Sequence, residues 1–187
     1  MNRRGTPDHA LPSFRYHPDP IASGSVVPSR DECAVCGEAR GFVYAGPVYA
    51  EDDLDDAICP WCIADGSAHR EHDVTFVDSE AFDEDASRDA MAEIVERTPG
   101  FATFQSERWP SCCGEPAAFL EPAGITEIRA RYRYLEGQLM PYIVHEMGVS
   151  GGAATRLLES LKRDASPTAF VFKCLHCDGY PAWIDRT

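Results

Sequence analysis

Apolar residues recur at helical spacing in the second half of the chain. Three such stretches follow one another between residues 124 and 164. Their apolar positions are Ile125, Ile128, Tyr132 and Leu135, then Leu139, Met140, Ile143, Val144 and Met147, then Ala154, Leu157, Leu158 and Leu161. Spacings of three and four residues place such side chains on one helix face. The pattern predicts three helices, the first ended by Gly137.

Short runs rich in β-branched and aromatic residues predict strands elsewhere. TAFVFKC (168–174) and GYPAWID (179–185) predict a hairpin whose tip carries a C-x-x-C motif. GFVYAGPVYA (41–50) is interrupted by a Gly-Pro pair, so it predicts a second hairpin. The core of the protein is therefore expected to combine helices with small antiparallel sheets.

The remaining segments read as loops and short helices. The polar composition of residues 1–10 predicts that they are disordered. In residues 11–21, apolar side chains lie between prolines, and this pattern predicts an extended arm. Residues 23–32 predict a loop. A short helix is expected from Pro60, because proline is tolerated in a first helical turn, and another over residues 91–100.

The eight cysteines lie in four close pairs. These are Cys33/Cys36, Cys59/Cys62, Cys112/Cys113 and Cys174/Cys177, and three of them are C-x-x-C. No apolar stretch follows the N-terminal arginines as it would in a signal peptide, and no segment approaches the roughly 18 apolar residues that span a bilayer. We therefore expect a cytoplasmic protein without a membrane segment. There, thiols stay reduced, and paired cysteines are metal ligands or redox groups before they are structural disulfides.

The first four cysteines have the spacing of a zinc site. Cys33 and Cys36 form a knuckle, and Gly37 permits the positive φ that such a turn often uses. Cys59 and Cys62 fall at a predicted helix start, where the helix dipole favours thiolates. A knuckle, a hairpin and then cysteines at a helix N-terminus is the order of a treble clef. The pattern predicts a closed Cys₄ zinc site.

A second zinc site is predicted from the other four cysteines. They are Cys112, Cys113, Cys174 and Cys177. Adjacent cysteines point in diverging directions, so one of the first two is open to replacement by His176, His145 or an acidic side chain. The alternative is that Cys112 or Cys113 is a buried free thiol. The expected arrangement is a zinc ribbon interrupted by the three predicted helices.

The chain is strongly acidic, with a formal net charge of −14 and a pI near 4.7. Eight thiolates would take this charge to −22, and two Zn²⁺ ions would return it to −18. Such a charge disfavours nucleic acid and anionic membranes as partners and favours a basic protein. Residues 51–57, EDDLDDA, are the densest acidic run and a candidate docking patch.

Two hypotheses of an enzymatic function remain as alternatives. A thiol oxidoreductase would use Cys59 and Cys62, but that class needs a βαβ context, and the acidic run 51–57 upstream opposes thiolate formation. A zinc hydrolase would need three protein ligands and a water. Residues 148–152 match G-x-S-x-G, but a helix rather than a strand is expected to enter this turn. A non-catalytic binding protein is favoured.

The predicted fold class is α+β. Small antiparallel sheets are expected around two zinc-knuckle or treble-clef-like sites, with a helical insertion over residues 124–164. Residues 11–80 would form a first zinc lobe and residues 81–187 a second, within one compact unit.

Several long strings of the chain resemble the CbrC-like family. They are YHPDP (16–20), RGFVYAGPVYAEDDLDDAICPWCIADGSA (40–68), ERTPGFATFQSERWPSCC (96–113), and the stretch from EGQLMPYIVHEMG (136–148) to FKCLHC (172–177). The resemblance covers the chain from about residue 11 to its end and implies a bacterial cytoplasmic protein. The family name is linked with colicin tolerance, which implies an immunity-like or tolerance role against a basic toxin. It implies no reaction and no catalytic residue, and the cysteines carry over as metal ligands.

Overall fold

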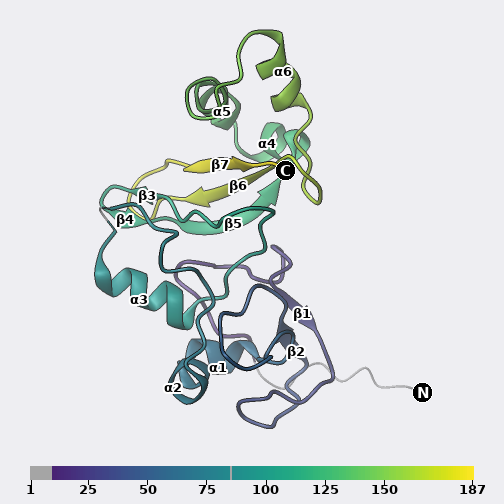
Figure 1. Ribbon diagram of the computed structural model, residues 1–187, viewed down its shortest axis with the longest axis vertical. Helices are drawn as coiled ribbons and strands as arrows, with labels where there is room; N and C mark the ends of the chain where they lie inside the picture. The colour runs from purple at the N-terminus through teal and green to yellow at the C-terminus, as the bar shows by residue number, and fades with distance from the viewer. Residues whose placement is uncertain (1–9, 85) are drawn as a thin grey trace, which may run out of the picture. The chain divides into compact units, whose positions relative to one another are not determined.

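The computed structural model describes residues 10–84 and 86–187 (Figure 1). Its chain packs into two compact units, each with its own interior. Unit 1 takes the chain up to Glu80 together with Arg88–Ala102, and unit 2 takes Ala81–Ser87 together with Thr103–Thr187. The disorder predicted for residues 1–10 lies, except for Ala10, outside the described residues. Among the described residues, no helix has both the length and the apolar character needed to cross a bilayer.

Unit 1 combines one short hairpin with three helices. Strand β1 (Val26–Pro28) pairs antiparallel with β2 (Phe42–Tyr44). The helices are α1 (Pro60–Ala64), α2 (Ser67–His72) and α3 (Arg88–Arg97). The helices predicted from Pro60 and over residues 91–100 are thereby confirmed.

The hairpin predicted within residues 41–50 is wrong. Strand β2 pairs with β1, so the loop predicted for residues 23–32 is also wrong. The cause is the ring of Tyr44, which is fully buried. The chain bends around this ring: the Tyr44 hydroxyl donates to Pro47 O at 2.9 Å, and a Cβ on Gly46 would lie 2.4 Å from the Tyr44 hydroxyl oxygen. Only glycine fits there, and the turn closes on a side chain instead of on a second strand.

Unit 2 contains a two-residue-loop hairpin, a three-stranded sheet and three helices. The hairpin joins β3 (Ser111–Cys112) to β4 (Glu115–Pro116). The sheet has the antiparallel order β5 (Ala118–Ala123), β6 (Thr168–Lys173) and β7 (Ala182–Asp185). This confirms the hairpin predicted between residues 168 and 185. Between β5 and β6 run α4 (Ile125–Arg131), α5 (Leu135–His145) and α6 (Gly152–Glu159).

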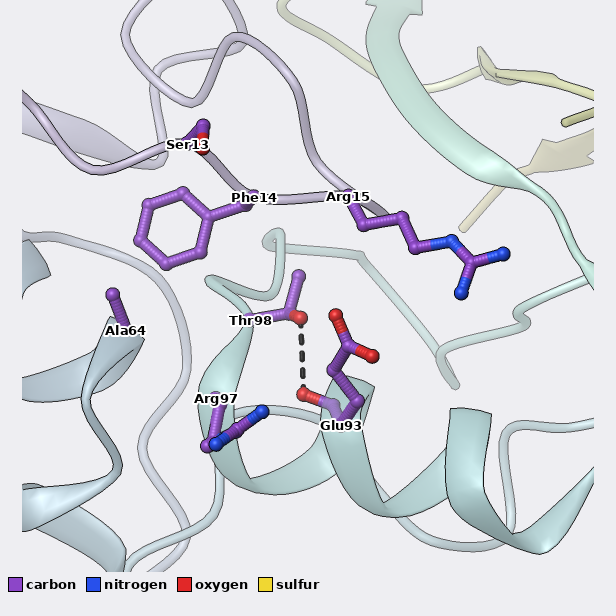
Figure 2. A pocket seen from close by; sticks show the side chains of 7 residues that line it. All are labelled: Ser13, Phe14, Arg15, Ala64, Glu93, Arg97 and Thr98. Carbon is purple, nitrogen blue, oxygen red and sulfur yellow. Dashed lines mark hydrogen bonds between the residues drawn. The ribbon is translucent and has the colours of Figure 1, made fainter.

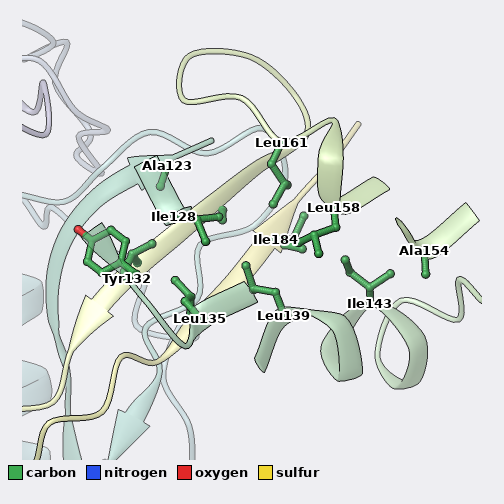
Figure 3. Close-up of a cluster of buried hydrophobic side chains, with 12 residues drawn as sticks. Ala123, Ile128, Tyr132, Leu135, Leu139, Ile143, Ala154, Leu158, Leu161 and Ile184 are labelled. Atoms are coloured by element: carbon green, nitrogen blue, oxygen red, sulfur yellow. The ribbon is translucent and has the colours of Figure 1, made fainter. Parts of the chain in front are cut away.

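Helices α4 and α5 pack against the sheet, and α6 packs on α5. Leu139 and Ile143 of α5 and Leu158 of α6 lie around Ile184 of β7 in one buried cluster (Figure 3). Their spacing along the chain is the helical spacing seen in the sequence. The described chain is thus a mixed α/β protein with small antiparallel sheets and six helices.

Gly137 does not end the first of these helices, and that prediction is wrong. It lies inside α5, and the break falls at Tyr132, which has φ −120° and ψ 70°. Tyr132 leaves the helical conformation because its side chain is fixed elsewhere. Its hydroxyl lies 2.5 Å from the Glu121 carboxylate, and its ring contacts Tyr180 edge-on.

Candidate metal centres

The first four cysteines converge in unit 1. The chain turns back after the knuckle, where the Gly37 amide donates to Cys33 O at 2.8 Å and Gly37 has φ +70°. Cys59 is the residue that precedes α1, and Cys62 lies in its first turn. The Sγ atoms of all four cysteines lie within 4.8 Å of one another.

Backbone contacts hold the two halves of this cluster together. The Ala34 amide donates to Ala57 O at 2.8 Å, which places the knuckle beside the chain entering α1. The Cys59 amide lies 3.3 Å from Cys33 Sγ and donates to it. An amide that points at a sulfur favours its thiolate form, which is the form that binds metal.

The second four cysteines converge in unit 2, and all four sulfurs again lie within 4.8 Å of one another. Cys112 and Cys113 sit on the β3–β4 hairpin. Its two loop residues, Cys113 and Gly114, have φ +57° and +80°, as short hairpin loops of the mirror-image type require. The positive φ of Cys113 turns its side chain toward the same point as that of Cys112. Adjacent cysteines therefore reach one position, which the sequence left open.

The other half of this cluster is the turn after β6. The Cys174 amide donates to Gly179 O at 3.0 Å and closes the turn. The amides of His176 and Cys177 each lie 3.4 Å from Cys174 Sγ, and the Gly179 amide lies 3.3 Å from Cys177 Sγ. Amides that donate to both sulfurs are typical of a thiolate knuckle.

The sulfur spacing fits a tetrahedral ion. In the first cluster the Sγ–Sγ distances include 3.8 Å (Cys33–Cys62), 3.9 Å (Cys36–Cys59) and 3.6 Å (Cys59–Cys62). The second cluster gives 3.9 Å for Cys112–Cys113 and 3.8 Å for Cys112–Cys177. Four sulfurs at a Zn–S distance of about 2.3 Å in a tetrahedron lie about 3.8 Å apart. A disulfide would need about 2.0 Å, and every cysteine is free.

The thiols of the first cluster cannot all ionise unaided. A hydrogen bond from the Cys59 thiol lowers the pKa of Cys33 to about 4, and the same thiol bond raises the pKa of Cys59 far above its usual range. Burial raises the pKa of Cys62 to about 12. One thiolate therefore holds its neighbours protonated, until a cation supplies the missing positive charge.

The two clusters differ in exposure. In the first, only the Cys36 residue is exposed, whereas in the second both Cys113 and Cys177 are exposed and only Cys174 is buried. The second site is therefore the more open to competing ligands.

The histidines weighed as ligands lie outside both clusters. Each cluster contains cysteines alone among the described residues. The His176 ring contacts the Glu115 carboxylate, and His145 is exposed on α5. The sequence reading missed His17, which is fully buried in the arm of unit 1. Nothing in its YHPDP surroundings distinguishes a buried histidine from a loop histidine.

Unit 1 also holds one small hollow between the arm and α3. It encloses about 150 Å³ and is lined by Phe14, Arg15, Glu93 and Arg97, among others. Figure 2 shows the Glu93 carboxylate reaching into it beside Thr98, whose hydroxyl donates to Glu93 O at 3.0 Å. The volume is below the roughly 300 Å³ at which small-molecule sites begin.

Fold and site together define a protein with two potential four-cysteine metal centres. The chain belongs to the uncharacterised protein family UPF0167, whose model matches residues 11–186.

Similar proteins occur in Mycobacterium and Pseudomonas. UPF0167 protein Mb2317 of Mycobacterium bovis and UPF0167 protein MT2352 of Mycobacterium tuberculosis are each 40% identical over 176 residues, which is 94% of this chain and 93% of theirs. UPF0167 protein PA1536 of Pseudomonas aeruginosa is 38% identical, over 89% of this chain and 92% of its own. No solved structure matches. None of these names mentions CbrC or colicins, so that part of the resemblance stays a prediction.

Proposed function

We propose that the chain is a zinc-stabilised, non-catalytic protein that binds a basic protein partner. The observation that supports zinc binding is the Sγ–Sγ spacing of 3.6–3.9 Å in both clusters. It matches the edge of a Zn–S tetrahedron. Each ion would be held by Cys33, Cys36, Cys59 and Cys62 in one centre and by Cys112, Cys113, Cys174 and Cys177 in the other. The first centre would then keep the knuckle and the helix start of a treble clef without the predicted hairpin between them, and the second would be of ribbon type.

Four sulfurs around each ion argue against catalysis. A zinc hydrolase keeps one coordination position for water, whereas these clusters supply a fourth thiolate. An oxidoreductase at Cys59 and Cys62 would need those two thiols free, but the Sγ atoms of Cys33 and Cys36 lie within 4.8 Å of both. The bound ions would stabilise the fold, with an apparent binding free energy of about 10 kcal/mol or more per structural site. The reduced thiols that such ligation requires suit a cytoplasmic location.

The acidic surface supports the basic partner. In residues 51–57 the five carboxylates are exposed, and Leu54 alone turns inward, with 7% of its surface exposed. A buried leucine in the middle of the run fixes the loop and presents its carboxylates outward. Complementary charge accelerates encounter with a basic protein. A basic toxin such as a colicin nuclease domain is one such partner, and binding to it would give a tolerance or immunity-like role.

Calorimetric titration with a purified, basic colicin nuclease domain tests this partner. We expect binding at 20 mM salt that weakens at 200 mM salt, because exposed charge pairs are screened. The variant Asp52→Asn/Asp55→Asn should bind more weakly, and a matched variant that removes two charges elsewhere, Glu71→Gln/Asp73→Asn, should bind as the parent does. Absence of binding at low salt would contradict the proposal that a toxin is the partner. It would not bear on the proposal of the two metal centres.

A further inference from the structure

Unit 2 contains a cavity of about 430 Å³ beside the end of α5, β7 and the segment of residues 105–108. Small-molecule sites occupy roughly 300–1,000 Å³. All residues that line it belong to unit 2, and no cysteine is among them. The cavity is thus separate from the metal centre of the same unit.

The cavity is lined by cations although the chain is acidic. Arg108 and Arg186 both border it. Within residues 10–84 and 86–187 neither guanidinium has a hydrogen bond or an ion pair. Arg129, by contrast, lies 2.7 Å from Glu136 and 2.5 Å from Glu159. Two unengaged guanidinium groups at one cavity suit a planar oxyanion, because each presents paired N–H donors.

Apolar and aromatic side chains form the rest of the wall. Trp183, Tyr142 and Met147 line the cavity. The Trp183 ring is stacked on Phe170, with centroids 4.8 Å apart and planes 16° apart. Its Nε1–H is buried and has no acceptor among the described residues. Unpaired buried donors are rare, and they mark places where water or a ligand completes the structure.

Hydrogen bonds fasten the loop that carries Arg108 at both ends. The Asp185 carboxylate accepts from the amides of Phe104 at 2.5 Å and Gln105 at 3.3 Å. At the other end, Trp109 Nε1 donates to Ala117 O at 2.8 Å. The loop is therefore held against β7. Both arginines project from backbone that these hydrogen bonds hold in place.

We propose that this cavity binds a small organic carboxylate. The carboxylate pairs with Arg108 and Arg186, and the apolar body lies against Trp183 and Met147. Glu146 also lines the cavity, so a ligand with a donor group such as an ammonium fits it better than a doubly charged phosphate. This inference does not depend on the zinc centres or on the basic partner.

Titration followed by ¹H–¹⁵N NMR of the zinc-loaded protein tests the proposal. The chain has three tryptophans, and the variant Trp183→Phe assigns the Trp183 indole signal. With 3-phenylpropionate the Trp183 signal should shift with a dissociation constant of about 1 mM or tighter. Trp61, whose Nε1 donates to Ala10 O at 3.3 Å in unit 1, is the internal control and should stay in place.

Matched probes and variants separate the carboxylate from other causes. The neutral 3-phenylpropionamide should give no shift, and phenyl phosphate should bind more weakly than 3-phenylpropionate. Arg108→Gln and Arg186→Gln should each weaken binding roughly tenfold or more, while Arg133→Gln, outside the cavity, should not. Unchanged binding in both cavity variants, equal binding of the amide, or tighter binding of the phosphate would overturn the proposal. The same spectra report whether each variant is folded.

Discussion

His17 should make the stability of the protein sensitive to mild acid. Its ring is fully buried, Nδ1 lies 2.6 Å from Pro99 O, and Nε2 lies 2.7 Å from Ser23 Oγ. A carbonyl only accepts, so Nδ1 carries the proton and Nε2 is the acceptor of the neutral ring. Burial lowers the pKa of His17 from 6.5 to about 4. The imidazole is thus neutral in the folded protein at pH values where the unfolded chain is protonated.

The sign and size of the effect follow from linkage. Between pH 6.5 and pH 4 the unfolded chain binds a proton at His17 that the folded chain does not bind. The contribution of the neutral, buried His17 to the free energy of unfolding is fully present above pH 6.5 and is lost as the pH falls toward 4. A lowering of the pKa by about 2.5 units corresponds to about 3 kcal/mol in total, of which about 1 kcal/mol is lost between pH 7 and pH 5.5.

Urea unfolding of zinc-saturated protein at several pH values between 7 and 5.5 measures this effect. The comparison is with His17→Asn, whose amide can still donate to Pro99 O but does not titrate. The free-energy advantage of the parent over this variant should shrink by about 1 kcal/mol across that range. His145→Asn, at an exposed position of α5, controls for the loss of one histidine. A parent-to-variant difference that is the same at pH 7 and pH 5.5 would show that burial of His17 does not link stability to pH.

Two further predictions concern unit 2 and the order of metal release. Glu121→Gln should lower the free energy of unfolding in urea by about 2–4 kcal/mol, because its buried carboxylate receives Arg163, Arg131 and Tyr132. Glu159→Gln, an exposed partner of Arg129, should cost about 1 kcal/mol or less, and equal losses would contradict this view. A chelating dye should remove zinc from the second centre first, because Cys113 and Cys177 are exposed. Stopped-flow absorbance should therefore lose its fast phase in Cys177→Ser, and loss of the slow phase instead would reverse the assigned order.

Local patterns in the sequence were sufficient to predict those helices and strands whose conformation depends on their own residues. Helical spacing predicted α4, α5 and α6, and the runs of β-branched and aromatic residues around the last C-x-x-C predicted β6 and β7. Cysteine spacing predicted which sulfurs meet. The helix and strand signals act within a few residues, and the cysteine pairs needed only the four-ligand chemistry of a shared ion, so no knowledge of the rest of the fold was needed.

The failures arose where the tertiary contacts of a side chain decide the backbone. The turn at Gly46 closes on the buried Tyr44 ring, and the break at Tyr132 follows from its bond to Glu121. The Cys113 turn is different, because a signal was available. The Cys-Gly step has the form of a two-residue hairpin loop with glycine second, and it would have predicted that both adjacent cysteines face one point.

Native mass spectrometry of the purified chain tests the two metal centres most directly. We expect a mass increase equal to two zinc ions, minus the protons that the thiols release. Cys62→Ser and Cys177→Ser should each bind one zinc ion tightly, from different centres. A folded parent protein with no bound metal, or variants that each keep both ions, would show that these cysteine clusters are not zinc centres.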